Sequence, residues 1–186
     1  MSNTMNNVML DLETVSTSSN AAIISIGAIF FDPLTGELGA EFHQPIDLES
    51  AMQHGVADAS TVAWWMKQSD EARKIFNHKD SCGLEVALYD FTDWVHQHGP
   101  EVQVWGNGAT FDNVILSNAY DSISYTRPWL YANDRDVRTV VELGRTLCNI
   151  NPKKHLPFEG TEHNALDDAK HQARYVSEIF KALAVK

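Results

Sequence analysis

Acidic residues of the kind that bind metal ions occur in three short motifs. The first, VMLDLETVST (8–17), places Asp11 and Glu13 in an otherwise apolar strand pattern. Side chains alternate between the faces of a strand, so both carboxylates point the same way and repel each other. Burying such a pair without a partner costs free energy. We expect a cation to compensate the repulsion; the alternative is an edge strand whose acids stay in water.

The second motif, WGNGATFDN (105–113), contains Asp112 just after a predicted strand. Gly106 and Gly108 permit tight backbone geometry, and ligand sites in open α/β sheets favour the carboxyl ends of strands. Alternatively, Asp112 is a first-turn residue that complements a helix dipole, with Thr110 as the N-cap. Taken alone, the second motif favours this alternative.

The third motif is HNALDDA (163–169). Within one helix, His163 and Asp167 would share a face and could form a ligand pair. However, Asn164 and Asp167 have capping-box spacing, which leaves His163 just outside the helix and free to orient. Asp168 then flanks the apolar stripe of this helix, whereas Asp167 lies nearly opposite it. We therefore expect Asp168 to face a partly buried site and Asp167 to be a solvated cap.

Four carboxylates and a free histidine suit the hydrolysis of a phosphodiester with two Mg²⁺ or Mn²⁺ ions. A base must take a proton from the attacking water, and a histidine with a pKa of about 6.5 suits that role near neutral pH. The sequence contains no P-loop ending, CxxC or HExxH that would indicate another chemistry.

The composition is that of one domain, residues 1–186, with 44% hydrophobic residues and two cysteines that favour a reducing compartment. The longest apolar run is too short to span a bilayer, so we expect no membrane contact and a cytoplasmic protein. The net charge of -11 argues against binding nucleic acid through a broad basic surface. It is compatible with an enzyme that approaches phosphate through bound cations.

Strand patterns dominate the first third of the chain, at 8–12, 22–31 and 37–45, with a DPLTG turn before the third. Helical periodicity follows at 70–76, with Ser69 as N-cap, and at 84–95, then a strand at 101–105. Further helices are predicted at 112–120, at 136–147 and from 165 on. This order indicates an α/β fold with a mixed sheet flanked by helices.

In order and spacing, LDLET, GNGATFD and HNALDDA resemble the three exonuclease motifs of the DEDDh superfamily of 3'-5' exonucleases. The segments TVAWWMKQSDEAR (61–73) and NDRDVRTV (133–140) resemble a narrower group of small bacterial exoribonucleases, T-even phage exodeoxyribonuclease A and exonuclease VIII-like prophage proteins. This resemblance implies an RNase H-like fold whose first three strands are antiparallel and whose later strands are parallel.

The resemblance also implies residue roles. Asp11, Glu13, Asp112 and Asp168 would hold two Mg²⁺ or Mn²⁺ ions, with Asp11 bridging them, and His163 would be the general base. Asp168 lies five residues after the histidine, as the family pattern requires. No catalytic motif departs from that pattern, so the resemblance implies an active enzyme.

Further residues are candidates for substrate binding. Trp64 and Trp65 are adjacent, so one is expected in the core and one partly exposed; we assign the base-stacking role to Trp65. Arg135 and Arg138 can contact phosphate or pair with acids of the chain itself. Lys153, Lys154 and His155 form a small basic patch that could guide a strand or be solvated surface. The substrate-binding prediction comprises Thr14, Trp65, Asn107, Arg135 and Arg138.

The sequence thus predicts a metal-dependent 3'-5' exonuclease that releases nucleoside 5'-monophosphates from single-stranded ends of RNA or DNA. The alternatives are a two-metal phosphatase acting on small phosphate esters and a non-catalytic nucleic-acid-binding module on the same fold. The preference between RNA and DNA is left open, because contacts to the 2'-hydroxyl decide it. By analogy with the relatives we expect that a homodimer can form.

Overall fold

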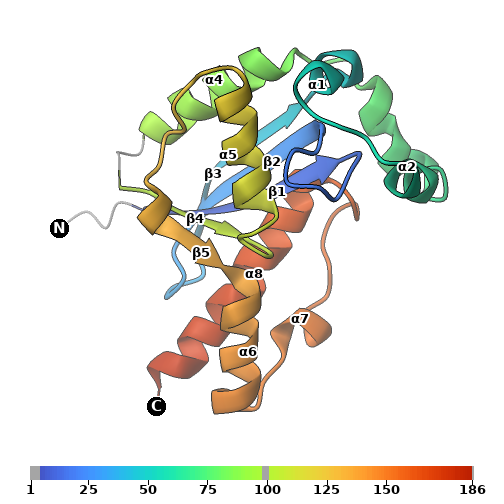
Figure 1. The fold of residues 1–186 in the computed structure, drawn as a ribbon. Coiled ribbons are helices and arrows are strands. Elements are labelled where there is room, and N and C mark those ends of the chain that lie inside the picture. The colour runs from blue at the N-terminus through green and yellow to red at the C-terminus, as the bar shows by residue number, and fades with distance from the viewer. Residues whose placement is uncertain (1–4, 98–100, 186) are drawn as a thin grey trace.

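Five strands form one mixed sheet in the computed structural model, which describes residues 5–97 and 101–185 (Figure 1). The spatial order is β3-β2-β1-β4-β5. The strand bounds are β1 Asn7–Thr14, β2 Ile23–Phe31, β3 Leu38–Pro45, β4 Gln103–Gly106 and β5 Asp134–Asp136. β1 pairs antiparallel with β2, and β2 with β3, whereas β1–β4 and β4–β5 are parallel. This confirms the predicted mixed sheet.

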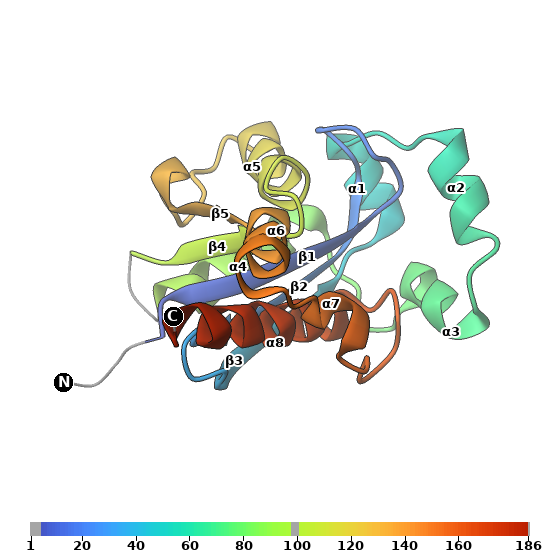
Figure 2. The same ribbon diagram turned by 90° about the horizontal axis from the view of Figure 1, so that it is seen from below.

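Helices cover both faces of the sheet. Their bounds are α1 Leu48–His54, α2 Ala59–Trp65, α3 Asp70–Arg73, the 3₁₀ helix η1 Lys74–Asn77, α4 Leu84–His96, α5 Asp112–Ser122, η2 Tyr131–Asn133, α6 Val137–Cys148, α7 Pro152–His155 and α8 Ala165–Ala184. One buried cluster lies between the sheet and α4 and α5, and a second between the sheet and α6 and α8. Figure 2 shows α8 lying along one face of the sheet.

β1 carries Asp11 and Glu13 among buried apolar residues. Its even-numbered residues, such as Leu10 and Leu12, are buried in the cluster under α4 and α5. Met9 faces the other way, into the cluster under α6 and α8. Because strand side chains alternate, Asp11 and Glu13 continue along the face of Met9, toward α8. The two carboxylates therefore share a face, as the sequence predicted.

Gly27 lets the N-terminus of α8 approach the sheet. It pairs with Asp11 in the β1–β2 register, in the middle of an otherwise apolar strand. A Cβ atom at Gly27 would lie 2.1 Å from the backbone carbon of Ala165, the first residue of α8. A glycine inside a strand often marks such a close approach. Here it brings the first turn of α8 directly opposite Asp11.

Several helices match their predicted positions, and several short elements were missed. The side chains of Ser69 and Asp136 cap α3 and α6 as N-caps, but α3 has only four residues before η1 begins. The sequence analysis missed α1, α2, β5 and α7, although Asp47 and Asp58 are N-caps of the first two. Among the described residues, every helix is too short or too polar to cross a bilayer.

Candidate active site

Four carboxylates converge beside the end of β1. Asp11 and Glu13 come from β1, Asp112 is the first residue of α5, and Asp168 lies in the first turn of α8. One Asp112 oxygen accepts the Leu12 N–H at 3.2 Å, which ties α5 to β1 between the two strand acids. The structure thus brings together residues more than 150 positions apart in the sequence.

Burial raises the pKa of all four carboxyl groups, and the charges of the other cluster acids raise those of Asp11 and Glu13 further. Burial, followed by the charges of Asp168 and Asp112, raises the pKa of Glu13 to about 9. Burial raises the pKa of Asp112 to about 7 and that of Asp168 to about 6, against hydrogen bonds that lower them. The pKa of Asp11 is also raised well above its usual value, first by burial and then by the charges of the neighbouring acids. Such a site is stable in its charged form only with cations present.

His163 lies at the edge of the acid cluster. Asn164 caps α8 by accepting the Leu166 and Asp167 N–H groups, so His163 precedes the helix, as predicted. Its φ of 64° is a left-handed conformation, and its N–H donates to Asp168 at 2.9 Å. Ligand atoms of Glu13, His163 and Asp168 lie within 4.8 Å of one another.

Two local details differ from the sequence interpretation. Asp167 is half-buried, and its carboxylate accepts the Thr161 N–H at 2.9 Å, so it fastens the loop before α8 instead of being a solvated cap. Thr110 is not the N-cap of α5: the cap position is Phe111, without a side-chain hydrogen bond. Asp112 therefore turns its side chain toward β1, which removes the purely capping alternative.

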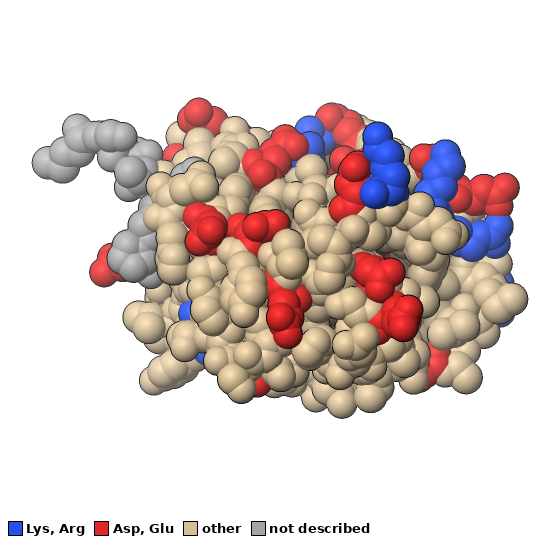
Figure 3. All heavy atoms as spheres, turned by 90° about the horizontal axis from the view of Figure 1, so that it is seen from above, with Lys and Arg blue, Asp and Glu red and all other residues tan. Residues whose placement is uncertain are grey.

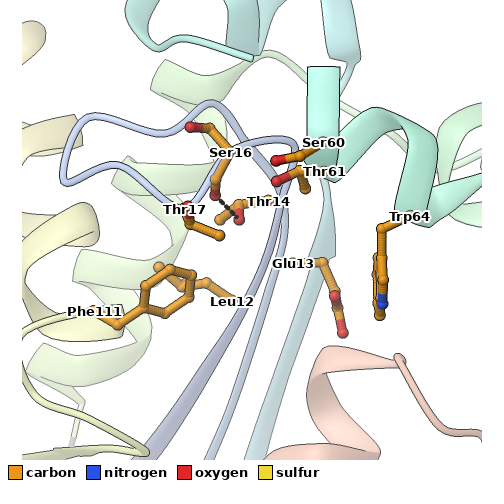
Figure 4. A pocket seen from close by; sticks show the side chains of 9 residues that line it. All are labelled: Leu12, Glu13, Thr14, Ser16, Thr17, Ser60, Thr61, Trp64 and Phe111. Carbon is orange, nitrogen blue, oxygen red and sulfur yellow. Dashed lines mark hydrogen bonds between the residues drawn. The ribbon is translucent and has the colours of Figure 1, made fainter. Parts of the chain in front are cut away.

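A cavity of about 470 Å³ opens beside Glu13, within the size range of small-ligand sites (Figure 4). Leu12 and Phe111 form one wall, and Glu13 and the Trp64 indole face them across the space. Hydroxyl groups line the remaining side; they belong to Thr14, Ser16, Thr17, Ser60 and Thr61. We call this cavity the hydroxyl pocket.

Three of these hydroxyl groups donate their proton to another group of the protein. Thr14 Oγ1 donates to the Ser16 carbonyl at 2.7 Å, and Thr61 Oγ1 donates to Asp58 at 2.9 Å. The Ser60 hydroxyl also donates to Asp58. The oxygens of these groups keep free lone pairs, so toward a ligand they act as acceptors. The hydroxyl pocket is therefore suited to a ligand that itself carries hydroxyl donors.

As expected, one of the two tryptophans is buried and the other is partly exposed, but the buried one is Trp65, to which the sequence analysis assigned base stacking. Trp65 is only 3% exposed and donates its indole N–H to the Thr14 carbonyl at 2.8 Å. Trp64 is 42% exposed, lines the hydroxyl pocket and packs against the His163 ring, with centroids 4.9 Å apart. Trp64, and not Trp65, is placed to contact a ligand; Trp65 holds the pocket together from behind.

The other predicted substrate-binding residues differ in whether their side chains are free to contact a ligand. Arg135 is occupied within the protein, since it donates to Gln103 Oε1 and to the carbonyls of Ala132 and Asp134. Arg138 is exposed beside the Gly108 backbone, and its charge lowers the pKa of Asp112 against the raising effect of burial. Asn107 is half-buried in the loop before Asp112, and its Oδ1 has no hydrogen-bond partner among the described residues.

Three residues that support the site escaped the sequence analysis. Gln172 donates to Asp11 at 2.7 Å from one turn after Asp168, a spacing that could have indicated a shared helix face. Asp58 accepts the Thr17 and Thr61 N–H groups and so joins the loop after β1 to α2. Gly27, which admits α8, had a visible signal as a lone glycine within an apolar strand.

The surface charge outside the site is mostly acidic. On the face seen in Figure 3, Asp and Glu side chains are spread over much of the width, and Lys and Arg gather at one end next to acids. This described face offers no continuous basic track for a polyanion.

Comparison with protein families matches residues 6–180 to the 3'-5' exoribonuclease Rv2179c-like domain. Among characterised proteins, an exodeoxyribonuclease of Enterobacteria phage T4 is 29% identical over 163 residues, which cover 72% of this chain and 70% of the phage protein. Both findings agree with the resemblance inferred from the three motifs.

Solved structures with the same fold include the nuclease domain of 3'hExo, a DEDDh family member bound to rAMP, with a TM-score of 0.66 and 13% identity; the match covers 97% of this chain and 94% of the other. Pop2p from S. pombe, in a form with Mg²⁺ and Mn²⁺ bound, gives a TM-score of 0.61 and 15% identity over 95% of this chain and 85% of the other. The predicted RNase H-like fold is confirmed.

Proposed function

The chain belongs to the 3'-5' exoribonuclease Rv2179c-like domain family and is a 3'-5' exonuclease; from this premise we propose that it uses two divalent metal ions and His163 to release nucleoside 5'-monophosphates from single-stranded 3' ends. The observation that carries the proposal is the convergence of Asp11, Glu13, Asp112 and Asp168 beside His163. No feature of the site favours a phosphatase or a non-catalytic binding module.

The donor set fits hard divalent cations. Carboxylate oxygens are the ligands that Mg²⁺ and Mn²⁺ prefer. Burial raises the pKa of Glu13 and Asp112, and a bound cation would offset this cost of ionising them. Asp11, Glu13, Asp112 and Asp168 would hold the ions, while Gln172 and the Leu12 N–H orient two of these carboxylates. Bound there, such ions stabilise negative charge on the attacking and leaving oxygens.

His163 would remove the proton from the attacking water. Its ring makes no hydrogen bond with a described residue and is held mainly by packing on Trp64, so both ring nitrogens remain available. Its backbone is anchored to Asp168. A base positioned in this way can reach a water molecule at the acid cluster and pass the proton to solvent.

The hydroxyl pocket would receive the terminal nucleoside. The Trp64 indole and the Phe111 ring present aromatic surfaces on which a base can stack regardless of its identity. The acceptor hydroxyls of Thr14 and Thr61 suit the sugar hydroxyl donors of a free 3' end. A strand without a free 3'-hydroxyl would lose these bonds, which supports exonuclease action at that end.

The decisive experiment compares two aspartates of the same helix. Asp112→Asn should lower release of mononucleotides from a 5'-labelled single strand by at least about 10³-fold in Mg²⁺ or Mn²⁺. The asparagine oxygen can still accept the Leu12 N–H, so the fold should persist by circular dichroism. The matched control, Asp121→Asn, alters an exposed residue of α5 and should retain wild-type activity. Equal activity in both variants would refute the metal-site assignment.

Substrate tests complete the proposal. Matched RNA and DNA strands, and chimaeras that differ only in the terminal sugar, measure whether the pocket distinguishes the 2'-hydroxyl. Strands blocked by a 3'-phosphate should resist cleavage. Release of inorganic phosphate from a monoester, with no nucleotide released from the strand, would instead support the phosphatase alternative.

A further inference from the structure

Most cations of the described chain are occupied by acids of the chain itself. Ion pairs within 4.0 Å involve Arg73, Lys74, Arg127, Arg145, Lys170, Arg174 and Lys181. Arg138 at the start of α6 and Lys153 on α7 belong to the smaller group of described cations, with Lys67, Lys79 and Lys154, that form no ion pair or side-chain hydrogen bond with a described residue. In a protein of net charge -11, unpaired cations near a catalytic site call for an explanation.

Arg138 lies at the rim of the acid cluster. Its guanidinium carbon would be 3.0 Å from a Cβ atom added to Gly108, whose φ is +108°. Gly108 precedes Asp112 by four residues in the loop that leads to the metal-binding acids. The charge of Arg138 contributes to lowering the pKa of Asp136, whose carboxylate accepts the N–H groups of Ala109 and Thr139. No described acid forms an ion pair with the guanidinium within 4.0 Å, so its N–H groups can also contact an external anion.

Lys153 is close enough to Arg138 for the two charges to repel. After burial, the Arg138 charge is the next cause that lowers the pKa of the Lys153 ammonium group. Figures 1 and 2 both place α7 beside α8 and near α6. After burial, the charges of Asp11 and Asp168 raise the pKa of the Tyr175 hydroxyl and the charge of Arg138 lowers it, in keeping with the position of Arg138 beside Gly108 at the acid cluster. Two neighbouring cations that form no ion pair within 4.0 Å with a described acid have the composition of a phosphate-binding site.

The positions of Arg138 and Lys153 relative to the hydroxyl pocket indicate in which direction a bound nucleic-acid strand would run. Ser60, Thr61 and Trp64 of α2 line the hydroxyl pocket. In Figure 1, α2 lies to the right of the end of β1, and α6 and α7 lie below it. If the terminal nucleoside occupies the pocket and the scissile phosphate meets the acids, the rest of the strand must leave the site. No cation lines the pocket, whereas Arg138 lies beside Gly108 and Lys153 lies on α7.

We propose that Arg138 and Lys153 form a phosphate subsite that binds the backbone of the nucleic-acid strand on the 5' side of the scissile phosphodiester. The strand then passes from the hydroxyl pocket over the acid cluster and across Gly108 toward α7. The guanidinium fork binds one phosphate in a bidentate manner, and the ammonium group adds a second, less directional contact. This subsite rests on the proposed function, because that function defines which phosphate is cleaved.

Neutral phosphate analogues test the position of the subsite. Single strands carry one uncharged methylphosphonate at the second, third or fourth linkage from the 3' end. In the wild type, one of these positions should lower kcat/KM about 10-fold, as expected for the loss of one ionic contact. In Arg138→Ala the same analogue should change kcat/KM by less than about 2-fold, because its partner is gone. An equal penalty in both proteins would overturn the proposal.

Binding without turnover separates this inference from the proposed function. With EDTA present, fluorescence anisotropy measures the Kd of a labelled strand as a function of NaCl. Arg138→Ala and Lys153→Ala should each reduce the slope of log Kd against log salt by roughly 0.7, the value for one phosphate contact on a single strand. Lys79→Ala removes an exposed lysine that is not part of the proposed subsite and should keep the wild-type slope. Unchanged slopes in the Arg138 and Lys153 variants would refute the subsite even if the enzyme cleaves the strand, and reduced slopes would support it even if no cleavage occurs.

Discussion

The two sides of the acid cluster differ in chemistry. The α2 side is neutral, with aromatic rings and hydroxyl acceptors around the hydroxyl pocket. The side toward α6 and α7 presents two cations, Arg138 beside the Gly108 backbone and Lys153 on α7, within range of each other's charge. A nucleotide has the same division, since its base and sugar are neutral and its phosphates are charged. The comparison indicates how an acidic protein can bind a polyanion: positive charge is needed only where the phosphates pass.

The largest effect should come from the centre that both sides share. His163→Ala should lower kcat by roughly 10²- to 10⁴-fold, the contribution typical of a general base. Neither side of the site is altered, so KM and the salt dependence of binding should stay close to wild type. Steady-state kinetics on one labelled strand measures both. A variant that kept its kcat and lost affinity would show that His163 belongs to the binding surface instead.

Metal binding should stabilise the protein more at high pH. The pKa values of Asp168, Asp112 and Glu13 are raised to about 6, 7 and 9. A raised pKa in the folded state means that stability is fully present at low pH and is lost as pH rises through these values. The metal-free protein should therefore lose stability from about pH 5 to 9 on account of these groups.

Thermal unfolding with and without Mg²⁺ or Mn²⁺ checks this prediction. The same metal concentration is used at both pH values; where it equals 100 times the Kd at pH 8, the stabilisation at pH 8 is about 2.7 kcal/mol. The increase in Tm should be larger at pH 8 than at pH 5.5, because the ligands are then ionised. Arg138→Ala should leave the increase nearly unchanged if the cationic side serves phosphates and not metals. An equal increase at both pH values would contradict the electrostatic account.

Gly27→Ala tests whether the acid cluster requires the close approach of α8 to the sheet. The added methyl group would collide with the α8 backbone at Ala165, so we expect destabilisation of about 1–3 kcal/mol. Displacing α8 should also reduce activity, because Asp168 and Gln172 move with it. Denaturant unfolding gives the free energy of unfolding. Gly83→Ala is the control, since its Cβ would meet only Ser50 Oγ at 3.3 Å and should cost little.

Trp64→Ala tests the neutral side with the smallest expected effect. Loss of base stacking should cost about 1–3 kcal/mol in kcat/KM, with no change in the salt dependence of binding. Because Trp64 also packs on His163, part of the loss should appear in kcat. Trp64→Phe should restore much of it.

A double variant separates the two contributions. In a His163→Ala background, Trp64→Ala should raise KM but no longer lower kcat. If kcat fell by the same factor in both backgrounds, Trp64 would not act through His163. If instead Trp64→Ala reduced the salt dependence, the division between a neutral and a cationic side would be wrong.

The sequence alone indicated the acid cluster because its local patterns are strong. Alternation along β1 places Asp11 and Glu13 on one face whatever covers that face. The Asn164 cap separates His163 from Asp168 within a few residues of sequence. The mixed sheet followed from strand and helix periodicity together with the resemblance to DEDDh exonucleases.

The side chains around that cluster were predicted less well, for a physical reason. Trp64 and Trp65 lie in a seven-residue helix whose orientation depends on the Trp65 hydrogen bond to Thr14, a residue about 50 positions away. The short elements α7 and β5, with Lys153 and Arg135, have too few residues for a periodic signal. Long-range packing decides which face of such an element is exposed.

The sequence by itself determined which residues can bind metal and that Asp11 and Glu13 point the same way, because these properties depend on residue type and backbone period. The tertiary structure alone decided that Gln172 supports Asp11, that Gly27 admits α8 and that Arg138, unlike Arg135, is unpaired at the rim of the site. Each of these contacts joins segments distant in sequence, and their approach is a result of packing the whole sheet against its helices.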